Sequence, residues 1–452
     1  MDLISRRIAA SFRSLGLLAA IAVVVLAGVP AASDEAGAPA QVVDIEPPSR
    51  IERYRVTDFG RSPSARDDRT SFAKFRVVER TGNCCENYLT SNSKGVLYDL
   101  GGSYINFTKD RGKTWKSVRP INPLVNGEGT IAVAPGGDII GVEWDPYSAD
   151  HLLSYKYTAE TKTWEYLEMP LHTPFYDRPW LAVVPGPFAI RGAQEEVPYV
   201  VFVDGFPHRG TFLYSTDGLT YVETSNPFLD QRLQGAVDKL KVGKAKDMDW
   251  IQTNSESPIV PLGGKSALAQ PGPFANSWAV FNGDTQTWSA LEGLDLEGRF
   301  QVDSRGRLHN FIDQGRSFIY QISTDDGKSW KSVKVELTDG TSYTSDFRVN
   351  SSLGVAAVSI HVDGTKADRD VLYRFDITGN KPRLERLYEI GKGDVDASSG
   401  VGQDIRMDFN TVTILPDGKL AISFLDSTTG PVFHLQEPIN PERLGPAMAI
   451  EL

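Results

Sequence analysis

One short pattern recurs along the chain and constrains its fold more than any other feature. It is clearest in Thr108–Trp115 (TKDRGKTW) and Ser323–Trp330 (STDDGKSW), and weaker copies lie at Thr158–Trp164, Ser215–Tyr221 and Asn282–Trp288. In the clear copies the first hydroxyl and the Asp carboxylate can accept backbone N–H bonds, Gly can supply a positive φ, and the final aromatic ring can be buried. We therefore predict five tight turns. Their Asp residues are predicted to serve the fold, because one carboxylate per turn offers too few ligands for calcium.

The spacing of these turns predicts the architecture. The closing aromatics Trp115, Trp164, Tyr221, Trp288 and Trp330 are 49, 57, 67 and 42 residues apart. Short apolar strands alternate between the turns, and two further strand-rich units follow over residues 346–387 and 404–434. This period predicts an all-β chain, a β-propeller of four-stranded blades, with seven blades favoured and six if one unit is a decorated loop. Either 51–56 or 72–78 is predicted to supply the strand that closes the last blade against the first.

Helical periodicity is confined to one segment. Leu229, Leu233, Val237 and Leu240 are spaced i, i+4, i+8 and i+11, which predicts a short helical insertion near 228–242.

The N-terminus has the composition of an export signal. Arg6, Arg7 and Arg13 precede an apolar run, Leu15–Val29, that is shorter than the ~20 residues of a spanning helix. We predict a signal peptide over 1–32, a linker over 33–50, one propeller domain over 51–440 and a C-terminal tail over 441–452. The mature protein is then expected to be periplasmic or extracellular, with no membrane span after cleavage.

Charge and cysteine content exclude several functional classes. The 452 residues carry 47 basic and 58 acidic side chains, a net charge of −11, which argues against a nucleic-acid binder. The only two cysteines, Cys84 and Cys85, are adjacent. They could form a vicinal disulfide, pair between chains or stay as thiols, and we predict the disulfide. We predict no metal site, because the six histidines show no ligand spacing, and no cofactor site.

A second regularity concerns the residues that precede each predicted innermost strand. Such strand starts converge on one end of a propeller channel, and each carries an acid, often with an arginine. The arginines Arg178, Arg299, Arg348 and Arg406 could bind a polar or acidic sugar, and Trp180 could stack on it. The alternative is that these Arg–carboxylate pairs tie neighbouring blades together. The acids are Glu86, Glu128, Asp177, Asp249, Glu297, Asp346 and Asp404.

The repeated turn resembles the Asp box, or BNR repeat, of the exported sialidase-like β-propellers, over roughly residues 85–435. That family includes sialidases, other carbohydrate-active enzymes and non-catalytic modules. Its sialidases combine three arginines, a Tyr nucleophile with a Glu, and an Asp acid/base. The segment from Glu297 to Leu308 is similar to the one that opens with the family's catalytic Glu. Asp313 stands where the second arginine is expected, and Phe409 stands at the nucleophile position, for which Tyr343 could substitute from another blade.

The resemblance thus implies the fold but not a complete sialidase site. We predict an exported propeller that binds carbohydrate, or another polar or anionic ligand, at the channel mouth. If it hydrolyses the ligand, Glu297 with Asp249 or Asp346 would act as a two-carboxylate pair. Alternatives are an exo-α-sialidase or other glycoside hydrolase, and a non-catalytic scaffold for an envelope protein partner.

Overall fold

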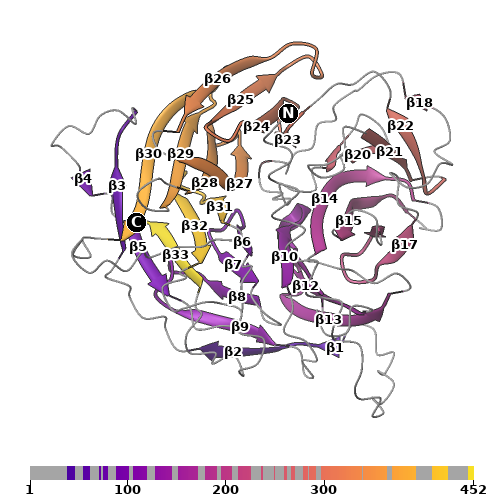
Figure 1. Ribbon diagram of the computed structural model, residues 1–452. Coiled ribbons are helices and arrows are strands. Elements are labelled where there is room, and N and C mark those ends of the chain that lie inside the picture. The colour runs from indigo at the N-terminus through magenta and orange to yellow at the C-terminus, as the bar shows by residue number, and fades with distance from the viewer. Residues whose placement is uncertain are drawn as a thin grey trace, which may run out of the picture. The chain divides into compact units, whose positions relative to one another are not determined.

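The described part of the chain is all-β, and its strands form seven sheets (Figure 1). All strand pairings among them are antiparallel except that of β18 with β22. All described residues belong to the unit Ala36–Leu452. The computed structural model describes residues 38–45, 54–61, 71–72, 75–79, 88–100, 105–119, 128–144, 151–171, 179–190, 195–205, 212–224, 236–237, 249, 259–261, 266–269, 278–283, 285–291, 297–337, 340–363, 369–392, 410–425 and 446–452.

Sheets 1 to 4 come from the first two thirds of the chain. Sheet 1 contains β2 (Gln41–Ile45), β6 (Tyr88–Ser91), β7 (Leu97–Leu100), β8 (Ile105–Thr108) and β9 (Trp115–Arg119). Sheet 2 contains β1 (Ala38–Pro39), β10 (Glu128–Val133), β11 (Ile139–Trp144), β12 (His151–Thr158) and β13 (Thr163–Pro170). Sheet 3 contains β14 (Pro179–Phe188), β15 (Val197–Gly205), β16 (Phe212–Ser215) and β17 (Val222–Thr224). Sheet 4 contains β18 (Ala236–Val237), β19 (Ile259–Pro261), β20 (Ser266–Ala269), β21 (Trp278–Asn282) and β22 (Thr287–Leu291).

Sheets 5 to 7 complete the described fold. Sheet 5 contains β23 (Arg299–Val302), β24 (Leu308–Asp313), β25 (Ser317–Ser323) and β26 (Lys331–Glu336). Sheet 6 contains β27 (Thr341–Asn350), β28 (Val355–Asp363), β29 (Arg369–Asp376), β30 (Arg383–Lys392), β3 (Tyr54–Asp58) and β4 (Ser71–Phe72). Sheet 7 contains β31 (Thr411–Ile414), β32 (Leu420–Leu425), β33 (Pro446–Glu451) and β5 (Phe75–Glu79). This succession of four-stranded antiparallel meanders is propeller-like.

The sheets contact one another through the first strand of each meander. In chain order these are β6, β10, β14, β19, β23, β27 and β31, and each contacts the next. In addition β31 contacts β6, where the Thr411 hydroxyl accepts the Leu89 N–H at 3.0 Å and the Ser91 and Thr413 hydroxyls lie 2.8 Å apart. The first strand of each sheet is thus the strand through which that sheet contacts its neighbours.

Two segments predicted to lie outside the propeller contribute strands to it. Within the predicted linker, β1 pairs with β13 and β2 pairs with β9, so that each adds to the outer edge of a sheet (Figure 1). The predicted C-terminal tail contains β33, which lies between β32 and β5. Met448, Ala449 and Ile450 of β33 are fully buried. The segment has no long apolar run, but burial of these three side chains stabilises it as part of the fold.

The predicted closing strand and the predicted helix have different outcomes. Residues 75–79, which overlap the predicted segment 72–78, pair with β33 as the outermost strand of sheet 7, whereas β3 of the alternative segment pairs with β30 of sheet 6. The helix predicted over 228–242 is wrong at Ala236–Val237, which forms strand β18 beside β22. The rest of that segment lies outside the described residues. The apolar spacing also suits a strand that adds to a sheet edge, so periodicity alone misled the prediction.

The repeated turns have the predicted geometry. In the turn after β8, the Asp110 carboxylate accepts the N–H groups of Lys113 and Thr114 at 2.9 Å, and the Thr108 hydroxyl accepts the Gly112 N–H at 2.9 Å. Gly112 has φ 79°. The turns of Ser215–Tyr221 and Ser323–Trp330 repeat these bonds through Asp217 and Asp325. We call these three segments the aspartate turns.

The aromatic residues that close the turns pack between sheets, as predicted. Trp115 of sheet 1 lies in a cluster with Met448 and Ile450 of sheet 7. Trp164 of sheet 2 lies 6.4 Å, ring centre to ring centre, from Phe107 of sheet 1, and Trp288 of sheet 4 lies 4.9 Å from Phe212 of sheet 3. Each of these rings therefore packs in the space between its own sheet and a neighbouring one.

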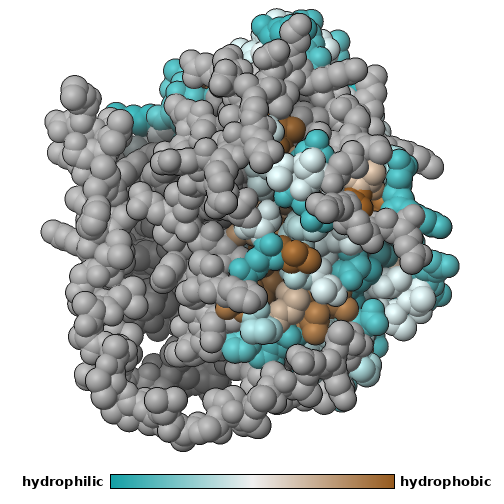
Figure 2. Space-filling model, turned by 90° about the vertical axis from the view of Figure 1, so that its right-hand side faces the viewer, coloured by the Kyte–Doolittle hydropathy of each residue, from teal (hydrophilic) through white to brown (hydrophobic). Residues whose placement is uncertain are grey.

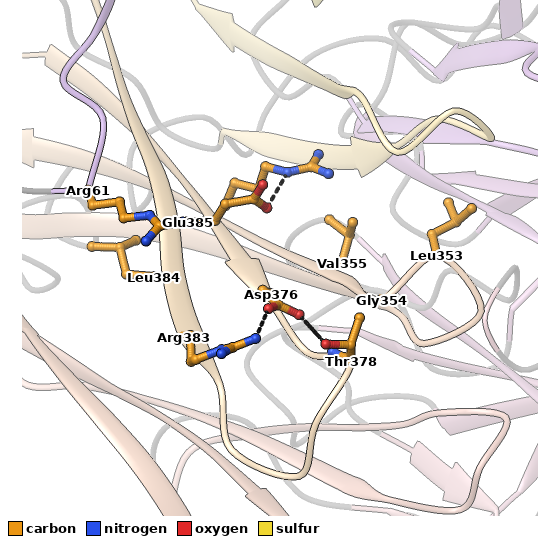
Figure 3. Close-up of a pocket in the computed structure, with 10 residues that line it drawn as sticks. Arg61, Leu353, Gly354, Val355, Asp376, Thr378, Arg383, Leu384 and Glu385 are labelled. Atoms are coloured by element: carbon orange, nitrogen blue, oxygen red, sulfur yellow. Dashed lines mark hydrogen bonds and ion pairs between the residues drawn. The ribbon is translucent and has the colours of Figure 1, made fainter.

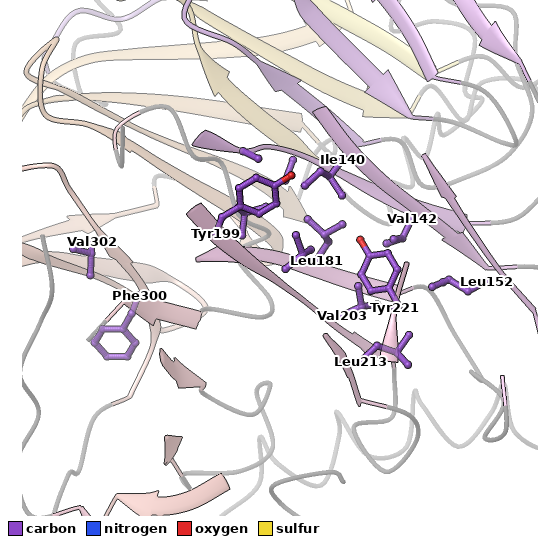
Figure 4. Packing of buried hydrophobic residues seen from close by; sticks show 14 of the residues in the cluster. Ile140, Val142, Leu152, Leu181, Tyr199, Val203, Leu213, Tyr221, Phe300 and Val302 are labelled. Carbon is purple, nitrogen blue, oxygen red and sulfur yellow. The ribbon is translucent and has the colours of Figure 1, made fainter. Parts of the chain in front are cut away.

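The largest part of the core joins sheets 2 and 3. In Figure 4, Tyr199, Leu181 and Val203 of sheet 3 lie beside Ile140 and Val142 of sheet 2. On the face in Figure 2, hydrophobic and hydrophilic residues of the described part are interspersed. Among the described residues, we find no helix with the length and apolar character needed to cross a membrane.

Candidate functional site

The candidate site is the end of the sheets at which the first strands begin. Within an antiparallel sheet the first and third strands run in the same direction. The aspartate turns follow third strands, for example β8, so the beginnings of the first strands lie at the opposite end of each sheet. The predicted acids and arginines were expected to converge there.

Asp346 and Arg348 form a buried ion pair in β27. One terminal nitrogen of Arg348 lies 2.8 Å from Asp346 Oδ1, and the other donates to the Tyr88 hydroxyl of sheet 1 at 3.1 Å. Asp346 Oδ2 accepts the Val412 N–H of sheet 7 at 2.8 Å. Both side chains are 2% exposed. The pair therefore joins three sheets, and neither group is accessible to a ligand. For Arg348 this agrees with the alternative interpretation, in which Arg–carboxylate pairs tie neighbouring sheets together.

The same contacts favour the charged form of Arg348. Burial lowers the pKa of Arg348, but the Asp346 carboxylate and the Tyr88 hydroxyl outweigh it, and the net shift is upward. Arg348 is therefore held in its charged form beside the Asp346 carboxyl group.

Arg299 and Glu297 lie at the start of β23. Arg299 is half-buried and donates to the Ser345 carbonyl, and to the Ser345 hydroxyl at 3.1 Å. Glu297 is exposed, and its backbone carbonyl accepts the Asn310 side-chain amide at 2.8 Å. Of the predicted site residues that the structure describes, these two lie together and remain accessible.

A group of polar residues that the sequence analysis missed lies between sheets 6 and 7. The His361 ring lies 3.3 Å from the Asp370 carboxylate, which also accepts the Asn410 amide at 3.4 Å. The hydroxyl of Ser359 is buried and has no hydrogen-bond partner among the described residues. All four residues are at most 2% exposed. No local sequence pattern indicates this group, because its residues come from three separate segments: β28, β29 and the segment before β31.

Asp249 lies at the other end of the sheets. Its carboxylate accepts the N–H groups of Ser351 and Ser352 at 2.9 and 2.8 Å, and the Ser304 hydroxyl at 2.6 Å. Ser304 follows β23, whereas Glu297 precedes it. These positions are seven residues apart, which spans roughly 20 Å of extended chain. The predicted pairing of Glu297 with Asp249 therefore fails, because glycosidase carboxylates lie about 5–10 Å apart.

Several other predicted residues cannot form an exposed site or lie outside the described residues. Trp180 is buried at 6% exposure in a cluster with Tyr88 and Trp164, so its ring is core rather than a stacking surface. Tyr343 occupies a register shift in β27, between Ser342 and Thr344. Arg178, Arg406, Phe409 and the Cys84–Cys85 pair are not among the described residues.

A second buried ionic group lies within sheet 5. His309 Nε2 lies 2.9 Å from Asp303 Oδ2, and His309 Nδ1 lies 2.8 Å from the Tyr320 hydroxyl. Arg307 Nε donates to the same Asp303 oxygen at 2.6 Å. Burial raises the pKa of Asp303, but the His309 and Arg307 interactions outweigh it and lower the value to about 2. Burial lowers the pKa of His309. These groups are fully enclosed, so they stabilise the sheet rather than forming a reactive site.

This group predicts how stability depends on pH. The neutral His309 ring is favoured in the folded state, so the unfolded chain takes up its proton first as the pH falls below 6.5. We expect stability to decrease from that pH downward, and again between about 4 and about 2 as Asp303 is protonated. His309→Gln should flatten the first decrease, and it should also reduce the second, because His309 is one of the two partners that lower the pKa of Asp303. Urea unfolding from pH 7 to pH 5 tests the first decrease, and an unchanged slope in the variant would contradict it.

Two pockets lie at the aspartate-turn end, near sheets 6 and 7. One, of about 380 Å³, is lined by residues of β28, β29 and β30 and by Arg61 (Figure 3). The other, of about 350 Å³, is lined in part by Asp58, Arg386 and Lys419. Both are far from Glu297 and Arg299 along the strands.

Several solved structures are similar to this chain at low sequence identity. No family model and no curated protein matches the chain. An ulvan lyase of polysaccharide lyase family PL25 bound to -[GlcA(1-4)Rha3S]- aligns at 11% identity and TM-score 0.39, covering 82% of this chain and 95% of that one. The NanB sialidase of Streptococcus pneumoniae aligns at 12% identity and TM-score 0.33, covering 82% and 69%. A chain of the mitotic checkpoint complex aligns at 8% identity and TM-score 0.43, covering 87% and 95%.

Proposed function

We propose that this chain is an exported seven-bladed β-propeller that binds a carbohydrate, or another polar or anionic ligand, at the end where its first strands begin. The observation that carries the proposal is the placement of Arg299, held by Ser345, beside the exposed Glu297 at that end. In a chain of net charge −11, an accessible arginine there is a specific feature rather than part of a basic surface.

Closure of the propeller is supported by contacts between the first and last sheets. The bonds of β31 with β6 and the pairing of β5 with β33 both join the two ends of the chain. A closed ring of seven blades leaves only short, protected sheet edges, and it brings the starts of all seven first strands together.

The chemistry of the two residues suits recognition rather than cleavage. A guanidinium group is planar and always charged, which suits recognition of a carboxylate or hydroxyl of a ligand by Arg299. Glu297 can accept hydrogen bonds from sugar hydroxyls. Cleavage would require a second carboxylate nearby, but Asp346 is buried and paired and Asp249 lies at the opposite end. We therefore propose binding without ordinary exo-sialidase activity.

We expect the purified protein to bind at least one acidic oligosaccharide in a glycan-array screen that also contains neutral sugars. Arg299→Ala should weaken that binding by about tenfold, because one charge-assisted hydrogen bond is lost. Lys331→Ala is the matched control, since Lys331 is exposed on β26 and its loss changes the net charge equally. Calorimetric titration of the best array hit gives both affinities.

Three results would contradict the proposal. The first is equal affinity of wild type and Arg299→Ala for the array hit. The second is the absence of any glycan binding together with capture of a protein partner, which would favour an envelope scaffold. The third is efficient release of sialic acid from a standard substrate, which would favour a sialidase.

A further inference from the structure

The larger pocket at the aspartate-turn end has the features of an anion-binding site. In Figure 3, Arg61, Leu384 and Arg383 lie on one side of it, and Leu353, Gly354 and Val355 lie on the other, with Asp376 and Thr378 between them. Arg374 and Glu385 also line it. Its volume of about 380 Å³ is large enough for a small ligand.

The pocket is walled by a turn that is held from both sides. Asp376 accepts the Thr378 N–H at 2.9 Å and the Thr378 hydroxyl at 2.6 Å, and it is paired with Arg383. From sheet 5, Arg305 donates to the Thr378 carbonyl at 3.1 Å and Arg307 donates to the Ile377 carbonyl at 3.0 Å. A turn fixed in this way presents its lining groups without further ordering on binding.

The lining carries an excess of positive charge. Arg61, Arg374 and Arg383 face only two acids in the lining, Asp376 and Glu385, so the local sum is three minus two, or +1. Two further arginines, Arg305 and Arg307, lie behind the turn, and Arg307 is paired with Asp303. This local excess contrasts with the net charge of −11 for the chain.

The existing pairs leave donors for a ligand. Arg374 uses Nε on Glu385 at 2.9 Å and one terminal nitrogen on the Gly418 carbonyl. Arg383 pairs with Asp376 through one terminal nitrogen, and its side chain is 71% exposed. Arg61 is exposed at the rim. Since a guanidinium has five N–H donors, each of these groups can also bind an oxygen anion.

We propose that this pocket binds a small oxyanion, a phosphate or sulfate group, with Arg61 and Arg383 as its direct donors. Leu384 on one side and Leu353 and Val355 on the other provide apolar lining, which suits a group carried on a carbon framework as well as a free ion. The site is separate from Arg299: from Ser345, which Arg299 contacts, β27 runs about 17 Å to Asn350 before the turn that enters this pocket.

The test is calorimetric titration of the full protein with inorganic phosphate and with inorganic sulfate at constant ionic strength, set with sodium chloride. We expect saturable binding in the millimolar range, and a loss of about fivefold or more in both Arg61→Ala and Arg383→Ala. Lys331→Ala should bind like wild type, since it removes the same charge from an exposed strand outside the pocket. Arg61 and Arg383 are both exposed, so we expect both variants to fold. Urea unfolding midpoints equal to that of wild type would verify this.

A second arm uses a sulfated and a phosphorylated monosaccharide. Tighter binding than that of the inorganic ion supports the site and shows that the anion is carried on a sugar, and equal binding supports it for a free ion. The absence of saturable binding of every probe would overturn the proposal. An equal loss in Lys331→Ala would also overturn it, because binding would then follow net charge only. Arg61→Ala should leave oligosaccharide binding at Arg299 unchanged.

Discussion

A chain that lacks residues 446–452 is expected not to reach the native state. The deletion removes β33, which pairs with both β32 and β5, so sheet 7 would lose its third strand and β5 would lose its partner. Burying one Met or Ile side chain stabilises a fold by about 1.5–3 kcal/mol, and Met448 and Ile450 are both fully buried. With the strand hydrogen bonds added, the loss is comparable to the roughly 5–15 kcal/mol that stabilises a typical protein. Circular dichroism and urea unfolding provide the measurement.

The matched control is removal of Leu452 alone, which is 41% exposed and follows the strand. It should leave the unfolding midpoint unchanged. If the longer deletion also folded with the wild-type midpoint, residues 446–452 would not be needed for the fold, and the pairing of β33 would be contradicted.

Asp249→Ala is expected to reduce stability by about 3 kcal/mol, since the Ser304, Ser351 and Ser352 donors would each lose a partner worth about 1 kcal/mol. Asp249 is 4% exposed, so water cannot easily replace the carboxylate. Asp249→Asn should cost less, because the amide keeps one oxygen acceptor. Urea unfolding of both variants measures the difference.

Glu160→Ala is the matched control for this prediction, because Glu160 is an exposed acid in a turn. Its unfolding midpoint should stay close to that of wild type. An Asp249→Ala protein with wild-type stability but altered ligand turnover would instead support the catalytic role first predicted for Asp249.

The comparison of sequence and structure shows which signals were local. The aspartate turns were predictable because every donor and acceptor in them lies within eight residues, as for Asp110 with Thr108 and Thr114. The alternating strands were predictable for the same reason. The segment over 72–78 was also predicted to contain a strand from its apolar pattern, and β5 lies over Phe75–Glu79.

Two of the strands, β18 and β33, could not be assigned from local signals. The strand β18 has two residues, and β33 is a short segment rich in small residues, PAMAIE. Each becomes a strand because a partner edge is available, β22 for the first and β32 with β5 for the second. Sheet pairing between distant segments is a tertiary interaction, so propensity and periodicity do not reveal it.

The candidate site also has some features that local sequence predicts and others that only the tertiary structure shows. Residue type and spacing identified Glu297 and Arg299 as neighbours at a strand start, and that placement follows from the local order of residues. Residue type and spacing also grouped Arg348, Asp346 and Asp249 with this pair, because each is a charged residue close to a predicted inner strand.

Which of these charged residues are exposed depends on the neighbouring sheets. Arg348 is covered because Tyr88, 260 residues away, lies against it, and Asp249 is enclosed by loops about 100 residues further along the chain. The sequence alone therefore determined the turns, the strand period and the set of charged residues, whereas contacts between sheets decided which of those charges stabilise the fold and which remain open to a ligand.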